Sequence, residues 1–195
     1  MYPDLNSRSA QLYERAKHVL PGGNSRTTID LKPHPIYVTH AEGSKVHDVD
    51  GNIYIDFINN YTSLIHGHAY PGVTEVVTEQ LSKGTAYSFG TEQEIAHAEL
   101  ICGRVPGFDK IRFMNSGSEA VMNAIKAARA FTGRPKIAKC EGAYHGSYDF
   151  AEVSLNSGPD DWGQNDPQAI PYSKGTPQGV LDDVVVIPYH DEVAA

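Results

Sequence analysis

The spacing of apolar residues changes along this chain, and each spacing predicts a different kind of element. From Ser7 to Leu20 apolar residues recur at helical intervals, and Pro21-Gly22-Gly23 follows, which predicts an amphipathic helix that stops at the glycines. From Ile36 to Phe57 apolar and polar residues alternate, with Glu42-Gly43 and Asp50-Gly51 between the runs. This pattern predicts a small antiparallel meander.

The later part of the chain alternates between helical and extended patterns. A helix is expected after the small residues 115–118, because apolar and alanine positions share one face before Gly133 and Pro135 end it. Thr91 and Glu94 have the spacing of a capping box at the start of another helix. The remaining expected elements are helices over 71–81 and 92–105 and strands over 111–114, 136–140 and 184–187.

Strands near residues 111, 137 and 184 that alternate with helices predict an α/β fold. We expect a mainly parallel sheet with helices on both faces, preceded by a small N-terminal α/β lobe. The predicted division is residues 1–68, with the first helix, the meander and an active-site loop, and residues 69–195, the first part of a larger domain.

Composition narrows the classes of function. The chain has 195 residues, of which 40% are hydrophobic, and its formal charge of −8 argues against a general nucleic-acid surface. It contains no apolar run long enough to span a bilayer and no signal-peptide pattern, so we expect a cytoplasmic protein without membrane contact. Cys102 and Cys140 lack metal-ligand spacing and are expected to be free thiols.

The small residues 115–118, before the predicted alanine-rich helix, form a candidate anion site. A strand that turns into a helix points unpaired backbone N–H groups and the positive end of the helix dipole at one place, which suits a phosphate. Gly117 leaves room for a ligand, and Ser116 and Ser118 carry hydroxyl groups. The alternative is that Ser118 only caps the helix. Neither a dinucleotide fingerprint nor a P-loop is present.

The segments MNSGSEA, TGRPKI and EGAYHG, with an alanine-rich helix between the first two, resemble the class III, fold-type I aminotransferases that use pyridoxal 5′-phosphate (PLP). Within that family the chain is most similar to the glutamate-1-semialdehyde 2,1-aminomutase branch and its β-amino-acid aminotransferase relatives. The resemblance implies that Ser116, Gly117 and Ser118 hold the cofactor phosphate. It also implies that Tyr144 stacks on the pyridine ring, with His145 beside it.

The same resemblance implies two substrate residues. Arg26, in the context PGGNSR, matches an arginine that contacts the substrate carboxylate, a role that suits a guanidinium group. A solvated loop arginine is the alternative. Tyr61 lies in the polar, glycine-punctuated segment 59–68 at a position where an aromatic residue faces the substrate. Family likeness also implies a homodimer that acts on a small-molecule amino donor and acceptor.

The family's chemistry requires a lysine that forms a Schiff base with the cofactor aldehyde. No lysine of this chain stands in the matching context, so we expect that lysine beyond residue 195 and an inactive chain in its absence. The sequence thus predicts the N-terminal part of a PLP-dependent aminotransferase or aminomutase that acts on an amino acid or amino aldehyde carrying a carboxylate.

Two other functions remain open from the sequence. The chain can be a catalytically inactive half-length partner or dimerisation module. Alternatively, His66-Gly67-His68 can provide two ligands of a metal hydrolase, which needs a further ligand from elsewhere. Residues 157–183 are rich in Gly, Pro, Asp and Asn and include Trp162, a composition typical of a lid, a binding loop or a disordered segment. A mobile loop of this placement covers the active site in the aminomutase branch, so the resemblance implies a lid.

Overall fold

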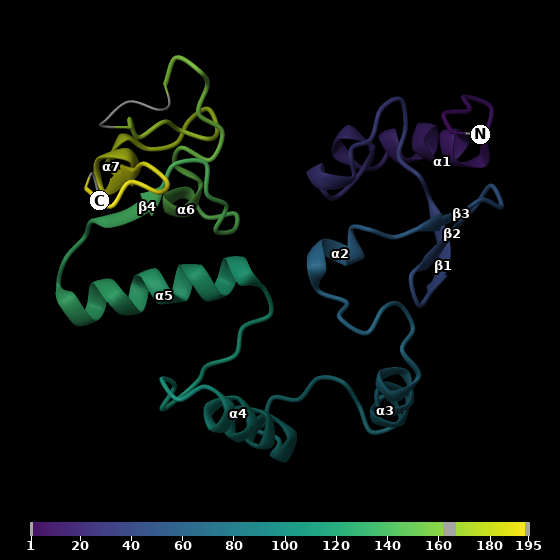
Figure 1. Ribbon diagram of the computed structural model, residues 1–195, viewed down its shortest axis with the longest axis horizontal. Coiled ribbons are helices and arrows are strands. Elements are labelled where there is room, and N and C mark those ends of the chain that lie inside the picture. Colours follow the sequence, from purple (N-terminus) through teal and green to yellow (C-terminus); the bar gives the residue numbers. More distant parts are fainter. Residues whose placement is uncertain (1, 162–166, 194–195) are drawn as a thin grey trace. The chain divides into compact units, whose positions relative to one another are not determined.

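The computed structural model describes residues 2–161 and 167–193. The chain forms two compact units, Met1–Gly90 (unit 1) and Thr91–Ala195 (unit 2), which are described separately. Figure 1 shows their helices and strands in chain order. The division by role at residue 68 stays a prediction.

Unit 1 begins with helix α1 (Arg8–Lys17), as predicted. The Ser7 side chain accepts the N–H of Ala10 and caps the helix. Strands β1 (Val38–Glu42), β2 (Lys45–Asp48) and β3 (Ile53–Ile55) form an antiparallel sheet in the order β1-β2-β3. This sheet confirms the predicted meander. Two short 3-10 turns, Pro21–Gly23 and Thr27–Ile29, connect α1 to the sheet.

Hydrogen bonds to Asp50 connect α1 to the β2–β3 turn. The Asp50 carboxylate accepts the Ser9 hydroxyl at 2.6 Å and the backbone N–H of Arg8 at 2.6 Å, and these bonds hold the pKa of Asp50 below its ordinary value. Burial raises the pKa of Asp48, but hydrogen bonds from the Asn52 side chain, the Tyr54 hydroxyl and two backbone N–H groups outweigh it and lower the pKa. Polar contacts therefore organise this unit as much as apolar burial does.

The last part of unit 1 contains two helices of different character. Helix α3 (Pro71–Leu81) matches the predicted bounds and begins with a proline, which suits the first helical position. Between β3 and α3 lies α2 (Asn59–Thr62), a single turn with unusual backbone angles.

Unit 2 contains the remaining helices and a two-stranded parallel sheet. Thr91 caps α4 (Glu92–Arg104) through the N–H of Glu94, as expected from the sequence, and α5 (Gly117–Thr132) ends at Gly133 with φ +67°. Strands β4 (Ile137–Cys140) and β5 (Val184–Ile187) pair in parallel around a core formed by Val153, Val180, Val184 and Val186. The unit also contains α6 (Asp149–Glu152) and α7 (Gln178–Asp182).

The predicted strand over residues 111–114 is wrong. This segment is irregular in the structure, because no described segment offers it a hydrogen-bonded neighbour and a strand exists only by pairing. The strands predicted over 136–140 and 184–187 are confirmed as β4 and β5. An α/β fold with a parallel sheet in its second unit therefore agrees with the prediction.

The segment predicted as a lid is partly anchored. The Ser154 hydroxyl donates to the carbonyl of Gln168 at 2.7 Å and accepts the N–H of Ile170 at 2.9 Å. The segment also contains α7. Trp162 lies outside the described residues, and the lid stays a prediction.

Two expectations from composition concern the whole chain. Cys102 and Cys140 are both free and half-buried. Within the described parts of the chain, no helix has the length and apolar character needed to cross a membrane.

Candidate functional site

The start of α5 is a capped helix end. The Ser116 hydroxyl accepts the N–H of Glu119 at 3.2 Å, and the Glu119 carboxylate accepts the N–H of Asn115 at 2.8 Å. Ser116 has extended backbone angles while Gly117 is already helical, so the cap is Ser116. The alternative in which Ser118 caps the helix is therefore wrong.

The first two amides of α5 remain available. Among the described residues, no acceptor lies within hydrogen-bond distance of the N–H groups of Gly117 and Ser118. A Cβ built on Gly117 would meet no atom within 4 Å, so the bend faces open space. We call Ser116, Gly117 and Ser118 the α5 cradle. Unpaired amides at the positive end of a 16-residue helix form an anion-binding arrangement.

The loop that carries Tyr144 and His145 is fastened to this cradle. The Ser118 hydroxyl accepts the N–H of Ser147 at 2.9 Å, and a Cβ on Gly146 would lie 2.6 Å from the Cα of Ser118. Gly146 also has φ +94°, a backbone angle that residues other than glycine rarely adopt. Gly146 and Ser147 are not among the predicted site residues, although the glycine that closes the segment EGAYHG is a visible signal.

Tyr144 and His145 both lie at the surface of unit 2. The Tyr144 side chain is 67% exposed, so its ring is open to a ligand. His145 contributes to a cavity of about 340 Å³ that also includes Val121 and Ile125 of α5 and Ile137 of β4. The structure thus places the Tyr144 loop at the start of α5 and leaves the tyrosine ring exposed.

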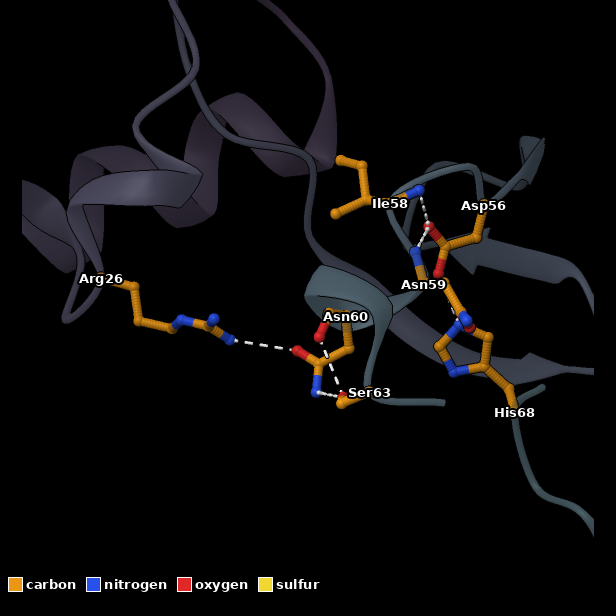
Figure 2. Close-up of polar contacts among 7 residues, drawn as sticks. All are labelled: Arg26, Asp56, Ile58, Asn59, Asn60, Ser63 and His68. Atoms are coloured by element: carbon orange, nitrogen blue, oxygen red, sulfur yellow. Dashed lines mark hydrogen bonds and ion pairs between the residues drawn. The ribbon is translucent and has the colours of Figure 1, made fainter. Parts of the chain in front are cut away.

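A second candidate site lies within unit 1. It is a groove of about 540 Å³, which we call the Arg26 groove; its lining includes Arg26, Asn60, Tyr61, Asp56, His68 and the apolar side chains of Ile29 and Val38. The Arg26 guanidinium lies over the Tyr61 ring, 5.4 Å from its centroid. Figure 2 shows the same guanidinium pointing at Asn60, whose side-chain oxygen accepts from it at 3.3 Å. The two predicted substrate residues are therefore brought together.

The backbone that presents Asn60 and Tyr61 is left-handed. Residues 59 to 62 have φ values of +50°, +46°, +56° and +67°, so α2 is a turn of left-handed helix. This conformation costs roughly 1–2 kcal/mol per residue, and asparagine tolerates it better than tyrosine or threonine. Such strain persists only where surrounding contacts impose it.

An Asp56–His68 pair supports that turn. One carboxylate oxygen of Asp56 lies 2.7 Å from His68 Nε2, and the other accepts the N–H groups of Ile58 and Asn59 at 2.9 and 2.8 Å (Figure 2). The bond to His68 is the main cause of a lowered pKa at Asp56. The sequence feature that could have indicated the turn is the pair Asn59-Asn60, three residues after Asp56.

The His-x-His motif is divided between two structural roles. The His66 ring stacks on Tyr70, with ring centroids 4.8 Å apart, while His68 pairs with Asp56. Within residues 2–161 and 167–193, no group of three His, Cys, Asp or Glu side chains could hold a metal ion. The hydrolase alternative therefore finds no third ligand in the described structure.

Comparison with known families shows to which protein family the chain belongs. The model of the family "Aminotransferase class-III" matches residues 28–169, which include the α5 cradle, Tyr144 and most of the Arg26 groove. This chain belongs to the class-III aminotransferases. The predicted family resemblance is confirmed, and the fold is that of the PLP-dependent fold-type I aminotransferases.

Three relatives illustrate the match. The chain is 44% identical over 183 residues to the glutamate-1-semialdehyde 2,1-aminomutase of Methanocella arvoryzae, covering 94% of this chain and 42% of that protein. It superimposes on an omega-transaminase from Sphaerobacter thermophilus with a TM-score of 0.93 and 55% identity, covering 97% of this chain and 43% of the other. A transaminase with PLP bound gives a TM-score of 0.85 and 47% identity, covering 94% and 42%. The chain therefore spans less than half the length of these relatives.

The cofactor of this family is pyridoxal 5′-phosphate, as predicted. The residues of the class-III chain fit it: the unpaired amides of Gly117 and Ser118 suit the phosphate, and the uncovered ring of Tyr144 suits a flat aromatic group.

Proposed function

We propose that this chain is the N-terminal part of a PLP-dependent aminotransferase or aminomutase that acts on an amino acid or amino aldehyde with a carboxylate. The observation that carries the proposal is the pair of unpaired amides at Gly117 and Ser118, beside the Tyr144 loop, in a chain of this family.

In this proposal, unit 2 binds the cofactor. The α5 cradle of Ser116, Gly117 and Ser118 holds the phosphate through backbone N–H groups and the helix dipole. Tyr144 stacks on the pyridine ring and fixes its plane, with His145 beside it. When bound, PLP supplies the electron sink that amino-group transfer requires.

The Arg26 groove binds the substrate. Arg26 donates two parallel hydrogen bonds to the carboxylate, and Tyr61 limits where the guanidinium can lie because its ring lies beneath it. The apolar part of the groove, which includes Ile29 and Val38, suits a substrate with an apolar body. The higher identity to an omega-transaminase than to an aminomutase, 55% against 44%, favours amino transfer between two molecules.

The covalent partner of PLP in this proposal is a lysine outside these 195 residues. Lys139 is buried in β4, where its amine donates to the carbonyl of Val153 and burial lowers its pKa. That amine is engaged inside the unit 2 core, which supports the assignment of the covalent role elsewhere. We also propose a cytoplasmic homodimer; light scattering of the purified protein measures the oligomeric state.

The test uses the intact gene product that carries this chain. Addition of PLP is expected to give a visible absorption band, and borohydride is expected to leave the cofactor attached to a lysine outside residues 1–195. Peptide mass spectrometry identifies that lysine. A folded protein that neither develops the band nor retains the cofactor after borohydride would falsify the cofactor role.

A further inference from the structure

We infer that Asp56 and His68 form a positioning pair for substrate binding: they hold the left-handed turn that sets Arg26 in place. This inference rests on the proposed role of the Arg26 groove. Neither residue contacts the carboxylate in this scheme, and both act through the backbone of residues 58–62.

The first step is the support of the turn itself. Tyr61 and Thr62 disfavour left-handed angles, yet both adopt them. Hydrogen bonds within the turn, from Thr62 to Ile58 and from Ser63 to Asn59, close it but do not select its hand. The outside constraint acts at its start, where Asp56 accepts the N–H groups of Ile58 and Asn59. Asp56 thus fixes the entry angle of the chain.

The second step is the fixing of Asp56 by His68. The His68 ring holds the second carboxylate oxygen at 2.7 Å, and the two side chains are only 21% and 14% exposed. Because both oxygens are engaged, the carboxylate cannot rotate without the loss of a bond. The ring therefore keeps the other oxygen directed at the turn (Figure 2).

The third step connects the turn to Arg26. Asn60 accepts from the guanidinium at 3.3 Å, the Tyr61 ring lies under it, and the Tyr61 hydroxyl donates to the carbonyl of Thr28 at 3.3 Å. A flexible arginine held on two sides loses less freedom when it binds a carboxylate. A relaxed turn would release both contacts and weaken binding without any change to Arg26.

The backbone of His68 has its own anchor, so the ring can be removed separately. His68 and Gly43 exchange two backbone hydrogen bonds, at 2.9 and 2.8 Å. These bonds keep the loop against the sheet whatever side chain stands at position 68. A substitution of the His68 side chain therefore removes the hydrogen bond between the imidazole and Asp56 and leaves the backbone bonds to Gly43 in place.

The test compares His68→Ala with His68→Gln in the intact gene product. The probe is 3-phenylpropionate, a carboxylate with an apolar body and no amine, and its Kd is measured by calorimetry. We expect His68→Ala to weaken probe binding about tenfold. Gln places a side-chain N–H near the former Nε2 position and is expected to restore binding to within about twofold. The affinity for PLP, which belongs to unit 2, should not change.

Two control variants separate the possible causes. Asn52→Ala removes a donor that lies 2.7 Å from Asp48, at another turn of the same sheet, and should lower the unfolding temperature without altering probe affinity. Arg26→Gln tests the groove itself. If Arg26→Gln leaves probe binding unchanged, the substrate role of the groove fails.

If Arg26→Gln weakens binding but His68→Ala does not, only the positioning inference fails. It also fails if His68→Gln binds the probe as poorly as His68→Ala. Equal losses of probe affinity in His68→Ala and Asn52→Ala would show a general structural effect and would overturn the inference as well.

Discussion

The Arg26 groove and the α5 cradle reach a defined geometry by different means. The cradle uses an ordinary helix start, with a serine cap, a glycine, and a second glycine that lets the Tyr144 loop approach. The groove uses left-handed backbone at non-glycine residues, held in place by contacts between side chains and backbone. The cradle thus has backbone conformations that its residues favour, whereas the groove has left-handed backbone angles that its tyrosine and threonine disfavour.

This difference indicates how each site should fail. A cradle whose conformation is locally favourable is disturbed only by groups that occupy its space or remove its cap. A groove whose backbone is strained depends on a few side chains some distance from the ligand. The predictions below test that contrast.

The largest effect is expected at Gly146. Gly146→Ala brings a Cβ to within 2.6 Å of the Ser118 backbone, so the Tyr144 loop must move away from the cradle. Overpacking of this kind costs about 1–3 kcal/mol. If that cost falls on the PLP-bound form, PLP binding weakens roughly 5- to 150-fold. Titration of PLP into the apoprotein, followed by absorption, measures the change.

Gly175→Ala is the matched control for that substitution. Gly175 has φ +90°, close to the +94° of Gly146, but its Cβ would meet no atom within 4 Å. The control carries the same backbone strain without the collision and should retain PLP affinity. Equal losses in the two variants would mean that strain alone matters and that the contact with Ser118 does not shape the cradle.

A smaller effect is expected from the two helix caps of unit 2. Ser116→Ala and Thr91→Ala each remove a hydroxyl that caps a helix, α5 and α4 respectively, and each should lower the free energy of unfolding by about 1 kcal/mol. Only Ser116→Ala should also weaken PLP binding, by several-fold, because only α5 carries the cradle. Denaturant unfolding and PLP titration give the two quantities. A loss of PLP affinity in Thr91→Ala would argue against a site confined to the start of α5.

The same contrast explains which elements could be predicted from the sequence: those whose conformation depends on local residues were easier to predict. Helices and caps repeat local patterns, and so α3 was found with its observed bounds and Thr91 was found as a cap. Ser116, Gly117 and Ser118 were predicted as the phosphate site because Ser-Gly-Ser and EGAYHG stand in a family-specific order, and that role stays a prediction. The alternative interpretation put the cap at Ser118 instead of Ser116, because the two nearby serines offer the same chemistry and only backbone angles distinguish them.

The errors arose where distant residues decide the conformation. Residues 111–114 have the composition of a strand, but pairing is a property of a neighbour and not of the segment. Tyr61 and Thr62 argue locally against a left-handed turn, whereas the contacts of Asp56 with His68 and with the amides of Ile58 and Asn59 support it. His68 looked like a metal ligand because its motif resembles one, whereas its partner lies twelve residues earlier in the chain.

The smallest expected effect is a response to acid that begins in unit 1. Asp48, Asp50 and Asp56 all have pKa values lowered in the folded protein, and all three lie in this unit. The stability they contribute is complete above their unfolded pKa, near 4, and is lost as the pH falls through the folded values. Hydrogen exchange, corrected for intrinsic rates and followed from about pH 6 to about pH 3, should show protection falling first in unit 1.

Asp56→Asn separates the contribution of the groove from that of the other two carboxylates. The variant keeps an acceptor for the amides of Ile58 and Asn59 but has no charge to titrate. Protection of residues 58–64 should therefore start lower and depend less on pH than in the unmodified protein. Helix α1, whose N–H groups of Arg8 and Ser9 donate to Asp50, should respond to acid as before. The same acid response of residues 58–64 in both proteins would show that the Asp56 charge does not hold the left-handed turn.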